Sequence, residues 1–230
     1  MKVIHIAGWS GSGKTTFIVE LCSHLKHLGK TATVKHIGSH HSILSPGKDT
    51  TLHYKAGAEP AIGIDEEKTC ASFHSTSLDD ALNLLSDTGV RYAVLEGFKK
   101  RPFQKILIGD LDDASLLKNP EIPDVLAVLD QFDDWYTLAG LMKDLGAACD
   151  HGHVYSWTGY APDYLHAVAL CAHIEGQYMN DPRISGIRIR VQRWTSDDRY
   201  PVYLVLGDSH GNDLTVFSEV LDRISPCILP

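Results

Sequence analysis

The stretch GWSGSGKTT, residues 8–16, follows the apolar run KVIHIA of residues 2–7. From Gly8 to Thr15 it matches the pattern G-x-x-x-x-G-K-[ST] in full, between a first strand pattern and a first helix pattern. Glycines let backbone N–H groups wrap around an anion without Cβ clashes, and the helix N-terminus adds a favourable dipole. The sequence therefore predicts a P-loop that binds the phosphates of a nucleotide. A chance glycine-rich turn is the alternative.

The residues of this loop have separate expected roles. The Lys14 ammonium should reach the β- and γ-phosphates, and the Thr15 hydroxyl should be one ligand of Mg²⁺. Thr16 can contact the α-phosphate. The other loop residues expected at the nucleotide are Ser10, Gly11, Ser12 and Gly13.

A P-loop protein also needs a carboxylate at the end of a nearby strand, where it holds the metal or the water bound to it. Residues 92–95 form a short apolar run, Glu96 follows them, and Gly97 lets the chain turn. We therefore predict Glu96 as a further Mg²⁺ ligand. The alternative is an ordinary exposed glutamate at a strand end.

Composition limits the class of protein. The chain has 230 residues, 43% of them hydrophobic, with a formal net charge of −8 and a sequence pI of about 5.9. An acidic chain argues against a nucleic-acid binder, which usually has a basic face. No apolar run approaches the ~20 residues that span a bilayer, and the strand pattern begins at residue 2 with no signal peptide before it. The five cysteines never form CxxC, which favours a reducing compartment. We therefore expect a cytoplasmic protein without a membrane partner.

Strand and helix patterns alternate through the first part of the chain. This alternation predicts an α/β fold, a P-loop NTPase domain with a mostly parallel sheet covered on both faces. The predicted strands are residues 2–7, 31–36, 61–64, 69–73, 92–95, 105–108 and 125–129. The predicted helices are residues 14–28, 50–56, 78–86 and 135–145.

The composition changes near residue 150, because Lys143 is the last lysine and arginine replaces it afterwards. Residues 149–160 have the character of a polar, aromatic connection, and residues 162–179 that of a helix. Alternating apolar residues then predict two strands, around Ile189 and Leu204, and the run LTVF predicts a third. We therefore predict a P-loop domain of residues 1–150 and a small C-terminal α+β domain of residues 151–230.

Several pieces of sequence outside the loop occur together in a specific order. They are KH at residues 35–36, PGKD at 46–49, AGA at 56–58 and EGFK at 96–99. With the loop, they resemble the MobB family of molybdopterin-guanine dinucleotide biosynthesis adapter proteins over roughly residues 1–146. Their joint occurrence is far more specific than a P-loop alone.

The resemblance implies a P-loop domain that forms a homodimer, binds GTP with Mg²⁺ and hydrolyses GTP weakly at most. It implies an adapter without catalytic residues of its own, which assists a MobA-type molybdopterin guanylyltransferase and meets molybdopterin as a further partner. The chain departs from the family at residues 37–45, which carry no carboxylate. His40 and His41 could replace a metal or partner contact there. The part after residue 150 is not covered by the resemblance.

Three further residues are candidates for the nucleotide site. Lys48 could contact a phosphate and Asp49 could orient Mg²⁺ or a water, or Asp49 could simply cap the helix that follows. Asp130, after the predicted strand 125–129, could accept hydrogen bonds from N1 and N2 of guanine. No NKxD motif supports this assignment, and without it the sequence does not separate GTP from ATP.

Two groups of polar residues have weaker functional explanations. The cations of residues 99–101 could meet an anionic pterin phosphate, or they could form a solvated face. Arg101 is the nearest candidate for an arginine finger in cis. His151 and His153 have a spacing that can hold a transition metal, but no clear third ligand accompanies them.

Three functions remain open on the sequence alone. The first is a GTP-binding adapter of molybdenum-cofactor maturation. The second is a P-loop kinase of a small molecule, which needs an arginine-bearing lid that residues 36–49 do not provide. The third is a regulatory NTP switch whose C-terminal part binds another protein.

Overall fold

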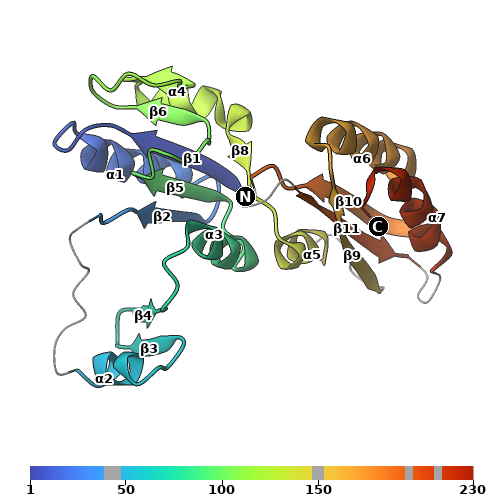
Figure 1. Cartoon of the computed structure of the whole chain (residues 1–230), viewed down its shortest axis with the longest axis horizontal. Coiled ribbons are helices and arrows are strands. Elements are labelled where there is room, and N and C mark those ends of the chain that lie inside the picture. Colours follow the sequence, from blue (N-terminus) through green and yellow to red (C-terminus); the bar gives the residue numbers. More distant parts are fainter. Residues whose placement is uncertain (39–47, 147–152, 195–198, 210–213, 230) are drawn as a thin grey trace.

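The computed structural model describes residues 1–38, 48–146, 153–194, 199–209 and 214–229. Its main sheet has the strand order β2-β5-β1-β6-β7, and all of these strands run parallel (Figure 1). A short strand, β8 (Asp133–Asp134), pairs antiparallel with β1. The parallel strands are β1 (Lys2–Ala7), β2 (Thr31–Lys35), β5 (Tyr92–Glu96), β6 (Lys105–Leu107) and β7 (Leu117–Lys118).

Helices cover both faces of this sheet. Ile4 and Ile6 of β1 point to the face where α1 (Lys14–Leu25) and α4 (Ile122–Ala127) pack. Val3 points to the opposite face, which α3 (Leu78–Asp87) covers. Burial on both faces explains why the sequences of β1 and β5 are almost continuously apolar rather than alternating.

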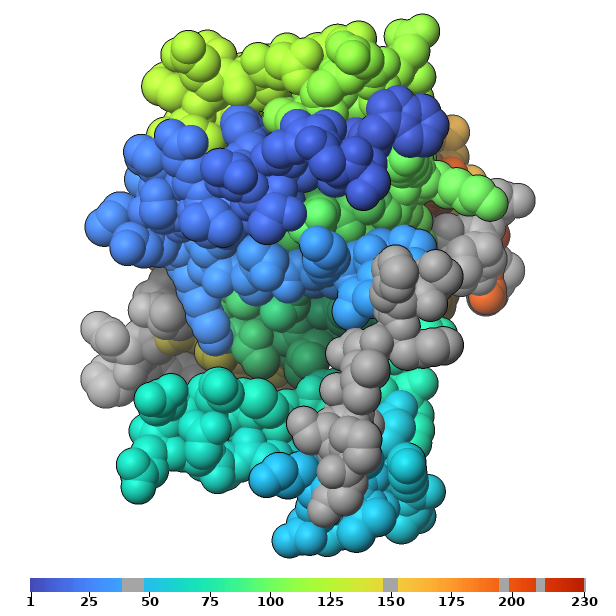
Figure 2. Space-filling model, turned by 90° about the vertical axis from the view of Figure 1, so that its left-hand side faces the viewer, coloured from blue at the N-terminus to red at the C-terminus, as the bar shows by residue number. Residues whose placement is uncertain are grey.

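A small separate unit follows β2 in the chain. It consists of α2 (Asp49–Lys55), which packs on an antiparallel hairpin of β3 (Ala61–Ile64) and β4 (Thr69–Ser72). Figures 1 and 2 show this unit as a lobe beyond the β2 edge of the main sheet.

The C-terminal part forms a second, antiparallel sheet. Its order is β10-β11-β9, from β9 (Val154–Ala161), β10 (Ile184–Val191) and β11 (Tyr200–Asp208). Two helices, α6 (Tyr164–Tyr178) and α7 (Thr215–Ile224), bury their apolar sides in a common core with this sheet.

The other face of the antiparallel sheet contacts the helix that precedes it. Leu141 and Leu145 of α5 (Leu138–Gly146) pack on Val205 of β11. Two short 3-10 helices, η1 (Leu129–Gln131) and η2 (Ser225–Cys227), complete the described structure. No described helix is long and apolar enough to cross a membrane.

The predicted fold class is confirmed, with a mostly parallel central sheet and an antiparallel sheet near the C-terminus. The predicted domain boundary near residue 150 lies outside the described residues and stays a prediction. The same holds for the environments of His40, His41 and His151.

The strand predicted at residues 125–129 was wrong. Helix α4 and η1 occupy this region. The helix begins with a capping box, in which Glu121 and Asp124 bond each other's backbone N–H groups, and a proline lies in its first turn. This reciprocal capping outweighs the β propensity of the short valine- and leucine-rich run.

Two predictions in the C-terminal part were also wrong. Residues 154–161 form β9, the strand that pairs with β11, and not a connection. The run LTVF opens α7 rather than a third strand of a meander, because Val216, Val220 and Ile224 recur every four residues and bury one helical face.

Gly176 lies inside α6, where glycine is a poor helix former. A Cβ at this position would meet no atom within 4 Å, and the backbone does not have a positive φ. We expect Gly176→Ala to raise the free energy of unfolding by about 0.5–1 kcal/mol, since alanine loses less backbone entropy in a helix. Urea denaturation of the two proteins measures this difference, and a lower midpoint for the alanine variant would contradict the expectation.

Candidate functional site

Three parallel strands end at one edge of the main sheet, beside the glycine-rich loop. Glu96 of β5 is level with Ile6 of β1 and with Lys35 of β2. The loop that follows β1 therefore opens next to Glu96 and Lys35, at the carboxyl edge where ligands of α/β sheets bind. A cavity of about 350 Å³ forms there. It is lined by Ser10, Gly11, Gly13, Lys14, Thr15, Thr16, Lys35 and Glu96.

The loop owes its shape to glycines. Gly11 and Gly13 have φ angles of +78° and +88°, which side chains with a Cβ rarely adopt. Gly8 is needed for a different reason, because a Cβ there would lie 2.3 Å from the carbonyl oxygen of Ile108. Ser12 does not line the cavity, and its Oγ lies 3.5 Å from Lys14 Nζ.

Replacing Gly8 by alanine should therefore strain the loop. The new methyl group collides with a backbone oxygen, so the loop or the residues after β6 have to move. We expect a loss of about 1–3 kcal/mol in the free energy of unfolding. Urea denaturation measures it, with Gly176→Ala as the matched control because the same added methyl group meets open space there. Equal midpoints for Gly8→Ala and the unaltered chain would refute the close approach.

The first turn of α1 points its free N–H groups at this cavity. The helix begins at Lys14, directly after the left-handed Gly13. No side chain caps this end, and the first turn contains no acidic residue. An uncapped helix N-terminus favours an anion, through both its dipole and its N–H donors.

Lys14 is positioned over the loop. Its Nζ donates a hydrogen bond of 2.5 Å to the carbonyl oxygen of Trp9. The ammonium is thus bound to a neutral backbone oxygen, a weaker partner than an anion. An anionic ligand in the cavity can take this donor from Trp9 and gives the ammonium a stronger partner.

Glu96 and Lys35 form an ion pair across the cavity, with 3.1 Å between Lys35 Nζ and Glu96 Oε1. The Glu96 side chain is 16% exposed and that of Lys35 is 56% exposed. The Thr15 hydroxyl and the Glu96 carboxylate are oxygen donors of the kind that Mg²⁺ prefers. Since both line the same cavity, the donor set fits Mg²⁺ held between the protein and a phosphate ligand.

His5 fixes the turn that follows Glu96. Its Nε2–H donates a 2.6 Å hydrogen bond to the carbonyl oxygen of Gly97, and the side chain is completely buried. Burial lowers the pKa of His5 below its usual value. The imidazole is therefore neutral, with its proton on Nε2, and it holds the strand end that carries Glu96.

The opposite side of the loop rests on the turn after β6. Gly109 has a φ of +86°, and a Cβ on it would lie 3.0 Å from the Cβ of Ser12. The Asn119 side chain bonds Gly109 at both ends, accepting from its N–H at 2.6 Å and donating to its carbonyl at 3.3 Å. The loop is therefore supported by β6 and β7 as well as by β1.

The structure does not bring Lys48 and Asp49 to this cavity. Both lie at the start of α2, in the lobe beyond β2. Asp49 is the first residue of that helix, where a carboxylate favours the helix dipole. Lys48 is the N-cap of this helix and no side chain caps it, so Asp49 is not the capping residue that the sequence suggested as an alternative.

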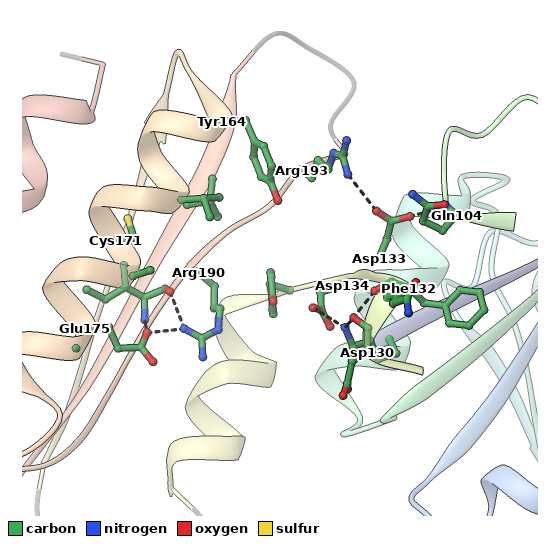
Figure 3. A pocket seen from close by; sticks show the side chains of 18 of the residues that line it. Gln104, Asp130, Phe132, Asp133, Asp134, Tyr164, Cys171, Glu175, Arg190 and Arg193 are labelled. Carbon is green, nitrogen blue, oxygen red and sulfur yellow. Dashed lines mark hydrogen bonds and ion pairs between the residues drawn. The ribbon is translucent and has the colours of Figure 1, made fainter. Parts of the chain in front are cut away.

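Asp130 lies at the amino end of β1, away from the glycine-rich loop, so the structure does not support its predicted contact with guanine. Its carbonyl oxygen accepts a 3.0 Å hydrogen bond from the side chain of Lys2, the first residue of β1, whereas the loop follows the last residue of that strand. The strand that was expected to carry Asp130 to the loop is α4 and η1 instead. Figure 3 shows Asp130 beside Phe132 and Asp134, at a different cavity.

This second cavity, of about 440 Å³, lies between the main sheet and the C-terminal part (Figure 3). Its cations already have partners on its walls. Lys2 pairs with Asp134 at 3.0 Å, and Arg193 lies 3.6 Å from Asp133. Arg190 pairs with the buried Glu175. The pair of Arg193 and Asp133 connects the two parts of the chain, while the other two pairs each lie within one part.

The cations after Glu96 have different environments. Arg101 pairs with Asp79 of α3, stacks on Phe103 and does not line the cavity, so its role as an arginine finger in cis stays a prediction. Lys99 does approach the loop, with its Nζ 3.9 Å from the centre of the Trp9 ring. Within the described residues, no group of three or more His, Cys, Asp or Glu side chains could hold a metal.

The sequence model of Molybdopterin guanine dinucleotide synthesis protein B (MobB) matches residues 3–131, more than half of the chain. This chain belongs to the MobB family. The matched residues include all those that line the cavity at the glycine-rich loop. The match ends before β8, so the antiparallel sheet lies outside it.

Two relatives have names that agree with this assignment. A molybdopterin-guanine dinucleotide biosynthesis adapter protein from Haemophilus influenzae is 32% identical over 136 residues, which are 56% of this chain and 74% of that protein. A relative from Methanocaldococcus jannaschii, provisionally given the same name, is 33% identical over 100 residues. The matched part is 44% of this chain and only 42% of that relative. The crystal structure of Bacillus subtilis MobB covers 59% of this chain and 100% of its own, at 18% identity and a TM-score of 0.46.

Lys35 lines the cavity of this MobB-family chain although the sequence pattern assigns it no role. The available signal is its place as the last residue of β2, two positions along the sheet from the loop strand β1. Only the register of β2 against β5 shows that its ammonium meets Glu96.

Proposed function

We propose that this chain binds Mg²⁺–GTP in the cavity at the glycine-rich loop and serves as an adapter in the synthesis of molybdopterin guanine dinucleotide. The observation that carries the proposal is the convergence of Lys14, Thr15 and Glu96 on one cavity at the uncapped N-terminus of α1. Membership of the MobB family supports the pathway and the choice of GTP over ATP.

The residues of the loop would perform the binding. Free N–H groups of the loop and of the first turn of α1 surround the phosphates, and Lys14 exchanges the carbonyl of Trp9 for a phosphate oxygen. Thr15 and Glu96 would hold Mg²⁺. When bound, Mg²⁺ neutralises charge on the β- and γ-phosphates.

The same cavity suggests slow hydrolysis. Among the described residues that line it there is no arginine to stabilise a transition state and no glutamine to orient a water. We propose at most a weak GTPase, whose work is to hold GTP for a partner rather than to cleave it.

The partner in this proposal is a MobA-type guanylyltransferase of the cytoplasm, which joins GMP to molybdopterin. The adapter names of the relatives support such a partner, and the family resemblance supports a homodimer. We assign no nucleic acid to the site, because the chain is acidic overall.

A guanylylation assay tests this function. The chain is incubated with Mg²⁺–GTP, molybdopterin and the guanylyltransferase, and formation of the dinucleotide is compared with and without the chain. We expect stimulation, and we expect none from Lys14→Ala. Phosphate transfer to a small acceptor would instead indicate a kinase. GTP binding without either effect would leave a regulatory switch.

A further inference from the structure

Two lysines approach the same cavity, and only one of them belongs to the glycine-rich loop. Lys14 donates to the carbonyl of Trp9, while Lys35 pairs with Glu96 at 3.1 Å. Lys35 is the more exposed member of its pair, so its ammonium can move while Glu96 stays fixed at the end of β5. The cavity therefore holds a second cation with a replaceable partner.

The partner of Lys35 is also the carboxylate that fits Mg²⁺. While Glu96 Oε1 bonds an ammonium, the carboxylate is a poorer ligand for a divalent cation, because two cations then compete for one negative charge. If a metal binds Glu96 in place of the ammonium, Lys35 is left beside the triphosphate without a carboxylate. The ammonium is a compact charge with three donors on a flexible four-carbon stem, which suits phosphate oxygens.

We propose that Lys35 is a second phosphate-binding cation of this site, held by Glu96 in the nucleotide-free chain and released to the triphosphate when Glu96 serves the metal. The proposal rests on the proposed function, since it concerns the same GTP site. It gives Glu96 two partners in succession, and it makes the affinity for the triphosphate depend on the metal through a protein side chain as well as directly.

The other cations near the loop are less suited to this role. Arg101 is bound to Asp79 of α3 and to the Phe103 ring. Lys99 lies over the exposed face of Trp9 and does not line the cavity. Among the described residues, Lys35 is therefore the cation that lines the cavity beside Lys14.

The test removes the Glu96 charge and measures GTP binding without metal. In Glu96→Gln, Lys35 has no carboxylate to hold it, so it should contact the phosphates even in EDTA. Calorimetric titration in EDTA should show GTP binding at least about threefold tighter than in the unaltered chain, because a negative charge is lost and an ammonium is released. Mg²⁺ should improve GTP binding less in this variant than in the unaltered chain.

Substitution of Lys35 in the Glu96→Gln background isolates its contact with phosphate, since the ion pair is already absent. Adding Lys35→Met should weaken metal-free GTP binding by about tenfold. Adding Lys35→Arg, which keeps the charge, should leave the metal-free GTP affinity within about twofold of that of Glu96→Gln alone. Lys30→Met is the matched control. Lys30 precedes β2, at the amino end of the strand rather than the carboxyl end where Lys35 lies, and its side chain bonds the carbonyl of Thr88.

The outcomes separate the two proposals. If Lys35→Met does not change the metal-free GTP affinity of Glu96→Gln, the role of Lys35 is overturned. The proposed GTP-binding function is not affected by that result. An equal loss from Lys30→Met would also overturn the role of Lys35, because the effect would then be one of net charge. If the unaltered chain binds no GTP with Mg²⁺, both the proposed function and the role of Lys35 fail.

Discussion

Lys14→Ala should abolish GTP binding, with a loss in affinity of at least about 100-fold, since a charge-assisted contact to a triphosphate is among the strongest that a side chain makes. The side chain lies over the loop at the start of α1, with its Nζ on a backbone oxygen that a phosphate can replace. Isothermal titration calorimetry with Mg²⁺–GTP measures the loss.

A second lysine of the same helix provides the control. Lys26 is exposed at the far end of α1, where it forms the C-cap. Lys26→Ala removes the same charge from the same helix and should leave GTP affinity unchanged within about twofold, because an exposed charge one helix length away is largely screened by salt. Circular dichroism checks that both variants are folded. An unchanged affinity in Lys14→Ala would remove the loop from the nucleotide site.

Glu175→Ala should clearly destabilise the C-terminal part. The Glu175 carboxylate is buried, accepts a 2.8 Å hydrogen bond from the N–H of Ile189 and pairs with Arg190. Its removal leaves a buried strand N–H without its acceptor and an arginine without its counter-charge. We expect a loss of about 1–3 kcal/mol in the free energy of unfolding, the usual cost of leaving a buried donor without its partner. Urea denaturation followed by far-UV circular dichroism measures this loss.

Glu219→Ala is the matched control for this substitution. Glu219 also pairs with an arginine, Arg183, at 3.1 Å, but on the surface of the same part of the chain. Surface ion pairs contribute little to stability, so its urea midpoint should move much less than that of Glu175→Ala. Similar shifts for the two variants would mean that burial of Glu175 does not determine its contribution.

The elements around the glycine-rich loop could be predicted because their local patterns agree with their tertiary environment. Residues 2–7 are apolar and both of their faces are buried, and α1 begins where the loop pattern ends. Glu96 could be placed for a similar reason, since an acid after a buried apolar run marks a strand end at the sheet edge. The signal in these segments lies within a few neighbouring residues.

The failures come from residues whose local signals conflict. The strand predicted at 125–129 has apolar residues that suit either structure, and the capping box of Glu121 and Asp124 decides for a helix. The start of α7 reads as a strand over four residues, and its four-residue periodicity appears only when Val220 and Ile224 are included. Asp130 was misplaced as a consequence of the first error.

The partner of Glu96 could not be predicted from local pattern at all. Lys35 and Glu96 are far apart in sequence, and their contact depends on the parallel register of β2 on β5. The pairing of Glu175 with Arg190 likewise depends on how α6 packs on β10. Ion pairs of this kind are set by tertiary structure, so neither charge by itself indicates the other.

The most direct test of the account is a crystal structure of the chain with Mg²⁺ and a non-hydrolysable GTP analogue. The account predicts the β- and γ-phosphates within hydrogen-bonding distance of Lys14 Nζ and of N–H groups in residues 10–15. It also predicts the metal at the Thr15 hydroxyl, with Glu96 beside it. A nucleotide in the cavity between Asp133 and Glu175, or a loop that stays empty at saturating analogue with Lys14 still on the carbonyl of Trp9, would contradict it.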